Sequence, residues 1–193
     1  MKLNAIILIG CMVLSYGCSR NLDKQLFVDL CESKVRIPTE MQVIKDGSLQ
    51  NMSVEDLSNS VKLVLYYSSA ECTSCVAGHF YELEWAFELY PKNKFFKPIV
   101  IMNPSENNYN DVVKLLRARP SIYPVYIDKI NAFQSLNPHI PNDTRFHTLL
   151  LDKYDNVILI GDPISSDTMW TLFKATLDNM LAHDGIYVPD EKN

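Results

Sequence analysis

Residues 61–75 decide the fold, and they read VKLVLYYSSAECTSC. The first seven are apolar apart from one lysine, and they are rich in β-branched and aromatic side chains. Such a run is typical of a strand that is buried on both faces of a sheet. Four small or polar residues, 68–71, then lead into a CxxC motif formed by Cys72 and Cys75.

The chain that follows the motif has the periodicity of a helix. Its apolar residues recur at spacings of four and three, which places them on one helix face. They are Val76, Phe80, Leu83, Phe87 and Tyr90, and Pro91 ends the pattern. We therefore expect a helix over residues 72–90, with Cys72 at its amino end, directly after the buried strand.

Strands and helices alternate along the rest of the chain. The patterns predict strands at 95–102 and 123–127, helices at 108–119 and 165–182, a hairpin of strands 148–151 and 157–161, and an edge hairpin within 35–53. Pro98 and Pro124 weaken the strands that contain them, because proline cannot donate a hydrogen bond to a neighbouring strand. This order predicts an α/β fold with a mixed central β-sheet flanked by helices on both faces.

The amino terminus has the features of an export signal. Lys2 precedes an apolar run at 5–14, and the small residue Gly17 comes directly before Cys18. The run is shorter than the roughly 20 apolar residues that cross a bilayer. Residues 14–18 resemble a bacterial lipobox, which implies that Cys18 is lipidated and becomes the new amino terminus. The alternative is an ordinary signal peptide with an incidental cysteine.

These features divide the chain into three parts. We interpret residues 1–17 as a lipoprotein signal peptide, 18–35 as a tether to a membrane and 36–193 as one folded domain. A length of 193 residues with 47% hydrophobic content is enough for one sizeable core. The net charge is −5 and the basic residues are scattered, so we expect no nucleic-acid partner.

The cysteines indicate redox chemistry. Outside the cytoplasm, the closely spaced Cys72 and Cys75 can cycle between a dithiol and a disulfide. The unpaired N–H groups and the dipole of a helix amino end favour a thiolate, which makes Cys72 the candidate nucleophile. Cys75, one turn further along, is the candidate resolving thiol. Cys11 lies in the leader, and we interpret Cys31 as a small buried apolar residue.

Two other interpretations of the motif stay open. The pair could be a structural or idle disulfide on a domain that only binds a partner, so the sequence leaves enzyme and binding module open. His79, four residues after Cys75, could also join the two thiolates around a metal ion. A structural zinc site usually has four protein ligands, and the chain has no second CxxC, so we expect no metal site.

From about residue 61 to 182 the chain resembles the thioredoxin superfamily, and within it the TlpA-like thiol–disulfide oxidoreductases of bacterial envelopes. The strand and helix around the CxxC motif carry this resemblance, as do residues 147–153, which are similar to the family strand that faces the motif. Residues 146–148 and 161–163 are also similar to thioredoxin-like lipoproteins of the Bacteroidetes type.

The resemblance implies a function and a cellular location. We expect a lipid-anchored envelope protein that faces the periplasm and reduces or exchanges disulfides of proteins or small molecules, without a bound cofactor. The alternative is a non-catalytic thioredoxin-like binding module of an envelope assembly.

Three positions depart from the family pattern. Glu71 precedes the first cysteine where thioredoxins usually have tryptophan, and its negative charge should oppose the Cys72 thiolate. Tyr66 stands where many thioredoxins have a buried acid, so a different proton acceptor is needed. His147 replaces the family's cis-proline.

The His147 position gives two expectations. A cis bond costs about 2.5–4 kcal/mol before a non-proline residue, against about 0.5–1 kcal/mol before proline, so we expect a trans bond. The imidazole could then face the cysteines and, when protonated, offset Glu71. The alternative is a partly buried histidine that is hydrogen-bonded to the backbone.

Overall fold

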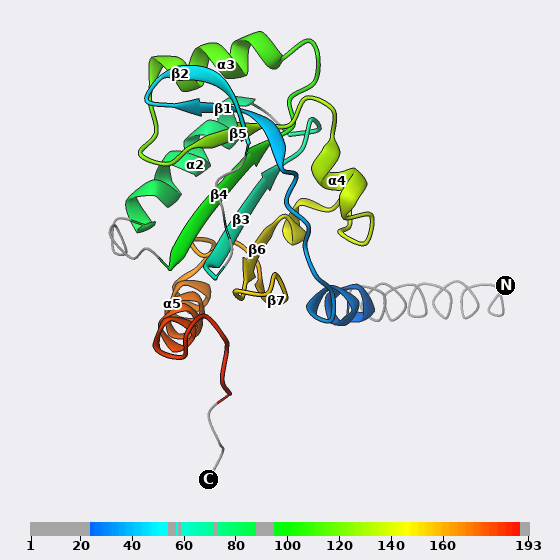
Figure 1. Ribbon diagram of the computed structural model, residues 1–193, viewed down its shortest axis with the longest axis vertical. Coiled ribbons are helices and arrows are strands. Elements are labelled where there is room, and N and C mark those ends of the chain that lie inside the picture. Colours follow the sequence, from blue (N-terminus) through cyan, green and yellow to red (C-terminus); the bar gives the residue numbers. More distant parts are fainter. Residues whose placement is uncertain (1–23, 54–56, 58, 72, 88–94, 190–193) are drawn as a thin grey trace, which may run out of the picture.

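The structure is a computed structural model that describes residues 24–53, 57, 59–71, 73–87 and 95–189. Seven strands form one sheet in the order β2-β1-β5-β4-β3-β6-β7 (Figure 1). The strands are β1 (Glu40–Lys45), β2 (Ser48–Ser53), β3 (Val61–Tyr67), β4 (Phe96–Met102), β5 (Val125–Ile127), β6 (Thr148–Leu151) and β7 (Val157–Ile160). The helices are α2 (Thr73–Phe87), α3 (Tyr109–Ala118), α4 (Ala132–Leu136) and α5 (Asp167–Ala182), with one more helix at residues 24–31.

The sheet is mixed, as the sequence predicted. Strand β3 pairs in parallel with β4, and β4 pairs in parallel with β5. The other pairs, β1 with β2 and β5, β3 with β6, and β6 with β7, are antiparallel. The parallel pairs are joined by helices α2 and α3, because parallel neighbours need a crossover connection.

Apolar cores lie on both faces of the sheet. On one face, α2 and α5 contribute Phe80, Phe87 and Phe173, and α3 contributes Leu116. On the other face, the helix at 24–31, α4 and the 3₁₀ turn Thr144–Phe146 cover the sheet. All seven residues of β3 are buried because its side chains alternate between these two cores. The predicted α/β fold with helices on both faces is therefore confirmed.

The prolines lie where the sheet tolerates them. Pro98 is inside β4, but the pairing of β4 with β5 is confined to Val100–Met102, so no strand pairs with Pro98 on that side. Pro124 comes directly before β5, which shortens the predicted strand to three residues. The end of the predicted helix after Phe87 lies outside the described residues.

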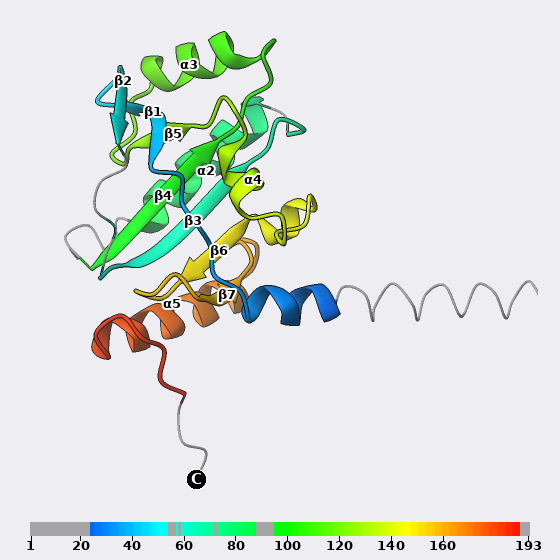
Figure 2. The ribbon, with the colours of Figure 1, turned by 45° about the vertical axis from the view of Figure 1, so that its right-hand side comes forward.

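The described part of the expected tether is packed on the sheet. Residues 24–31 form a helix next to β7, and the following segment runs across the sheet to β1 (Figure 2). Leu30 and Val35 are buried, with 1% and 2% exposed surface. The packed unit therefore starts before residue 36, where the sequence placed the domain boundary. No helix among the described residues is long and apolar enough to span a membrane.

Candidate functional site

The CxxC motif lies where β3 passes into α2. Strand β3 ends at Tyr67, whose carbonyl oxygen accepts a hydrogen bond from Asn103 N at 2.8 Å. Cys72 lies outside the described residues, and of Cys75 the structure describes the helical backbone in the first turn of α2. The first turn of α2 contains no acidic residue, so no carboxylate in that turn offsets the positive end of the helix dipole.

Glu71 is fixed in the loop before the motif. Its Oε1 accepts hydrogen bonds from Ser68 N at 2.8 Å and from Ser68 Oγ at 3.1 Å. Burial raises the pKa of Glu71, but the neighbouring His147 and the hydrogen bonds from Ser68 outweigh burial and hold the pKa below its usual value. Glu71 is therefore a carboxylate at neutral pH.

His147 lies under this loop and is 3% exposed. No cis peptide bond occurs among the described residues, so the predicted trans bond before His147 is confirmed. The ring donates from Nε2 to the carbonyl oxygen of Pro141 at 3.0 Å. Its Nδ1 lies 3.8 Å from Glu71 Oε1 and has no hydrogen-bond partner in the described part of the chain.

The structure shows the backbone hydrogen bond that one interpretation of His147 predicted, and the role beside the cysteines stays a prediction. The side chain is hydrogen-bonded to the backbone through one nitrogen and directed toward the residue before Cys72 through the other. The Glu71 carboxylate is therefore the charged group that faces Nδ1 of His147.

Tyr66 is buried near the end of β3. Its hydroxyl donates to Asn131 Oδ1 at 2.9 Å, and its ring lies 5.0 Å from the His147 ring. Burial, helped by the charges of Asp128 and Glu71, raises the pKa of Tyr66 to about 12. The hydroxyl therefore keeps its proton and cannot serve as a base.

His79 joins three elements of the fold. Its Nδ1 lies 2.9 Å from the hydroxyl of Tyr67 at the end of β3, and its Nε2 lies 2.9 Å from Asp162 Oδ2 in the loop after β7. Asp162 is held in turn by the backbone N–H of Ile164 at 3.1 Å. Both ring nitrogens are engaged, so His79 would have to give up one of these bonds to ligate a metal ion.

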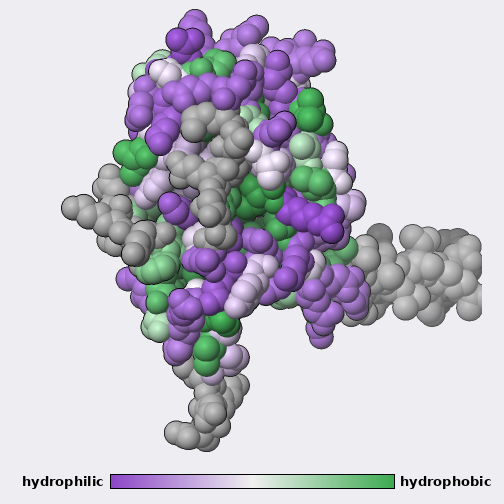
Figure 3. Space-filling model, in the orientation of Figure 1, coloured by the Kyte–Doolittle hydropathy of each residue, from purple (hydrophilic) through white to green (hydrophobic). Residues whose placement is uncertain are grey.

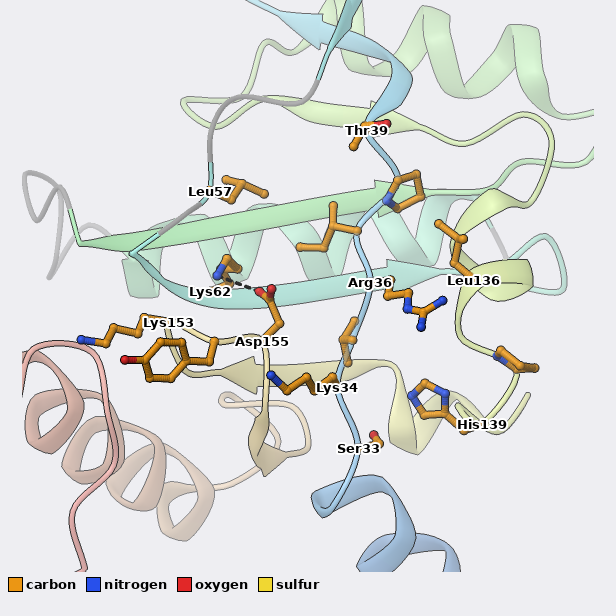
Figure 4. A pocket seen from close by; sticks show the side chains of 15 residues that line it. Ser33, Lys34, Arg36, Thr39, Leu57, Lys62, Leu136, His139, Lys153 and Asp155 are labelled. Carbon is orange, nitrogen blue, oxygen red and sulfur yellow. Dashed lines mark ion pairs between the residues drawn. The ribbon is translucent and has the colours of Figure 1, made fainter.

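A large hollow lies on the face of the sheet opposite α2. It has a volume of about 1150 Å³ and lies on both sides of the segment 33–39 (Figure 4). Lys34, Arg36 and His139 line it, as does Lys62, which pairs with Asp155 at 2.8 Å. Figure 3 shows hydrophilic residues around apolar ones on this face. None of the described residues that line the hollow belongs to α2.

No protein-family profile and no curated protein matches the chain. Several solved structures do. A candidate protein disulfide isomerase from Bacteroides thetaiotaomicron is 17% identical, with a TM-score of 0.51 over 77% of this chain and 91% of its own. A candidate thiol-disulfide oxidoreductase from Bacteroides vulgatus is 15% identical, with a TM-score of 0.51 over 75% and 96%. The mitochondrial 2-Cys peroxiredoxin from Plasmodium falciparum is 13% identical, with a TM-score of 0.51 over 81% and 98%.

The fold is thioredoxin-like. At these identities the likeness concerns the fold, and the roles of individual side chains must come from the geometry of this chain. The thioredoxin-like sheet brings the loop of Glu71, the turn before β6 with His147 and the loop of Asp162 to the end of β3 where α2 begins.

The sequence missed two residues of this region. Tyr67 and Asp162 were not singled out, although both contact His79. For His79 the sequence does hold a signal: it follows Cys75 by four residues, which places both on one helix face. No local pattern points to Asp162, which is 83 residues away from His79.

Proposed function

We propose that this protein is a thiol–disulfide oxidoreductase of the cell envelope that works through Cys72 and Cys75. The observation that carries the proposal is the place of the CxxC motif, between the buried strand β3 and the amino end of α2 in a thioredoxin-like fold. A helix amino end favours a thiolate on the first cysteine. The solved structures with this fold include proteins described as disulfide isomerases and thiol–disulfide oxidoreductases, which supports the same chemistry.

The proposed reaction has two steps. The Cys72 thiolate attacks a substrate disulfide, a Cys72–substrate disulfide forms, and the other substrate sulfur leaves as a thiolate. Cys75 then attacks the Cys72 sulfur, the Cys72–Cys75 disulfide forms, and the second substrate sulfur leaves. Two electrons pass to the substrate, and a second redox protein would have to restore the dithiol. The substrate class is protein or small-molecule disulfides.

Glu71 and His147 are proposed to set the reactivity of Cys72. The charge of Glu71, next to Cys72 in the chain, raises the free energy of the thiolate. A proton on His147, 3.8 Å from the Glu71 carboxylate, would offset this charge. The pair therefore acts as an adjustable charge beside the nucleophile.

Attachment to a membrane through Cys18 is part of the proposal. It rests on the signal-like residues 1–17 and on the small residue before Cys18. Such a signal directs the domain out of the cytoplasm, to an oxidising compartment where a disulfide can persist. A periplasm-facing location would therefore suit the redox chemistry.

Reduction of insulin by dithiothreitol tests the activity. The wild type should accelerate precipitation of the insulin B chain, and Cys72→Ser should abolish the acceleration. Cys31→Ser is the matched control, because burial and the charge of Glu32 raise the pKa of Cys31 and make its thiol a poor nucleophile. Equal rates for the wild type and Cys72→Ser would contradict the proposed activity.

A non-catalytic binding module is the second candidate function. The observation that favours it is the hollow beside residues 33–39, which is large enough for a ligand (Figure 4). In that case Cys72→Ser would leave the protein's cellular role intact, whereas substitution of Arg36 in the hollow would impair it.

A further inference from the structure

His79 lies on the same helix face as the proposed resolving thiol. Residues four apart on an α-helix are neighbours, and helical side chains lean toward the amino end of the helix. The backbone of α2 therefore places His79 one turn after Cys75, on the same helix face. The Tyr67 hydroxyl, 2.9 Å from His79 Nδ1, comes from the end of the adjoining strand.

The partners of His79 allow it to hold or release a proton without moving. Asp162 is an acceptor, so Nε2 carries a hydrogen and donates it to Oδ2 at 2.9 Å. The Tyr67 hydroxyl can either donate to a neutral Nδ1 or accept from a protonated Nδ1. Both protonation states are thus fully hydrogen-bonded, and only the hydroxyl hydrogen has to turn.

The charges around the ring are all acidic. Asp162 faces it from the loop after β7, Glu82 from α2 and Glu71 from the loop before α2. The hydrogen bond to Asp162 raises the pKa of His79 and outweighs burial, which lowers it. Burial and the charges of Asp162 and Glu71 raise the pKa of Tyr67, so its hydroxyl stays protonated.

We propose that His79 is the proton acceptor for the Cys75 thiol, with the Tyr67 hydroxyl as relay and Asp162 as the group that orients the ring. This proposal rests on the proposed oxidoreductase function. It supplies the proton acceptor that Tyr66, at the position of the family's buried acid, cannot provide.

The proposed transfer balances protons and electrons. The Cys75 S–H gives its proton to the Tyr67 oxygen, while the Tyr67 hydrogen passes to His79 Nδ1. The Cys75 thiolate attacks the Cys72–substrate disulfide, the Cys72–Cys75 bond forms, and the substrate thiolate leaves with the bonding pair. The thiolate then takes up the proton, either from His79 or from water. His79 and Asp162 are each 30% exposed, so water can reach them.

The resolving step can be observed by itself with Ellman's reagent. Reaction of Cys72 with the reagent releases one thionitrobenzoate and leaves a second on Cys72, and attack by Cys75 releases the second. Stopped-flow absorbance therefore shows a first phase that depends on reagent concentration and a second phase that does not. The full chain carrying Cys31→Ser is used, and the signal of the same chain with Cys72→Ser and Cys75→Ser is subtracted to remove any other thiol.

The pH dependence of the second phase distinguishes a base from a structural residue. In the wild type, the rate should rise with pH until His79 is neutral and then level off. His79→Gln should move the midpoint to higher pH, toward the ordinary thiol value of about 8.5, and slow the second phase at pH 7 at least ~10-fold. Asp162→Asn should move the midpoint to lower pH, because it removes the charge that raises the pKa of His79.

Further variants complete the test. Tyr67→Phe should slow the second phase and spare the first. His183→Gln is the matched control, because His183 is exposed at the end of α5 and its ring contacts the carbonyl oxygen of Asn179 in the same helix. Both phases should be unchanged. A first-phase rate like that of the wild type shows that a variant is folded. If His79→Gln lacks this rate, the pH midpoint of Asp162→Asn alone tests the relay.

Two results would overturn the relay. One is a second-phase profile in His79→Gln that superimposes on the wild type. The other is a midpoint that moves to higher pH in Asp162→Asn, as it does in His79→Gln. Release of a single thionitrobenzoate by the wild type would be a different outcome, since it would overturn the proposed oxidoreductase function itself.

Discussion

Glu71 and His147 occupy two positions where thioredoxins have uncharged residues, and the fold brings them within 3.8 Å of each other. Each alone would disturb the site. A carboxylate before Cys72 opposes its thiolate, and a buried imidazole nitrogen without a partner is costly to desolvate. A protonated His147 would form an ion pair with Glu71, and in that state the two charges would compensate each other.

Replacing Glu71 tests its effect on the nucleophile. Glu71→Gln keeps an oxygen acceptor for Ser68 but removes the charge, so Cys72 should ionise at lower pH. The measurement is the rate of iodoacetamide labelling of Cys72 against pH, with the labelled cysteine identified by mass spectrometry. Glu32→Gln, directly after the helix at 24–31, is the control and should leave the profile in place. A shift to higher pH would contradict the assignment.

Replacing His147 should have the opposite effect. His147→Ala leaves the Glu71 charge uncompensated, so the labelling profile of Cys72 should move to higher pH. The pKa of Glu71 should also return toward its ordinary value, because His147 is one cause of its decrease. In the double variant His147→Ala with Glu71→Gln, the shift caused by His147→Ala should largely disappear. Equal shifts with and without Glu71 would show that His147 acts by another route.

At the scale of elements, the loop between β7 and α5 determines where Asp162 lies. Gly161 has a φ of +124°, a conformation that residues with a side chain rarely adopt. A Cβ there would lie 2.9 Å from Met169 Cε in α5. The glycine thus lets the chain turn sharply between the sheet edge and the carboxylate that contacts His79.

A pair of glycine substitutions tests this constraint. Gly161→Ala should lower the free energy of unfolding by at least about 1 kcal/mol, because of backbone strain. Gly78→Ala is the matched change inside α2, where a Cβ meets no described atom within 4 Å. It should raise the free energy of unfolding by about 0.5–1 kcal/mol, since alanine favours helices. Urea denaturation measures both, and a neutral Gly161→Ala would argue against the strained turn.

The helices and strands also show which kinds of secondary structure can be predicted from a sequence. Strand β3 and helix α2 are long and strongly periodic, and both were predicted to within a few residues. Helix α4 and the turn Thr144–Phe146 have five and three residues, too few for a periodic signal, and they were missed. The contact of His79 with Asp162 joins residues 83 positions apart, so only the folded chain reveals it.

At the scale of the whole molecule, the described part of the amino-terminal segment is packed on the sheet. Residues 24–35 are mixed and polar, which suggested a tether, yet Leu30 and Val35 are buried in the core of the sheet face opposite α2. Short apolar stretches among polar neighbours are a weak signal, because their burial depends on a surface that distant strands build. The packed unit is therefore longer at its amino end than the pattern indicated.

Lipidation of Cys18 would place this unit close to a membrane. Only residues 19–23 lie between Cys18 and the helix at 24–31, and a fully extended chain spans at most about 3.6 Å per residue. We expect incorporation of a labelled fatty-acid analogue in the wild type and none in Cys18→Ser. Cys11→Ser, in the predicted leader, should be labelled like the wild type. Undiminished labelling of Cys18→Ser would contradict the lipid anchor.

The packing of the amino-terminal helix can be tested through one side chain. Leu30 is 1% exposed and lies in the same core as Val35 and Phe133. Leu30→Ala should lower the free energy of unfolding by about 2–5 kcal/mol, the usual cost of emptying a buried leucine site. Phe27→Ala, on the same helix but 45% exposed, removes a larger side chain and should change stability by less than about 0.5 kcal/mol.

Comparison of Leu30→Ala with Phe27→Ala distinguishes a packed helix from a tether. If residues 24–35 only linked the domain to a membrane, neither substitution would affect unfolding by urea, because neither side chain would be buried in the native state. A loss confined to Leu30→Ala would show that the helix unfolds together with the sheet. It would follow that a chain beginning at residue 36 leaves Val157 and the core around β6 and β7 partly uncovered, and such a chain should unfold at lower urea concentration than one beginning at residue 24.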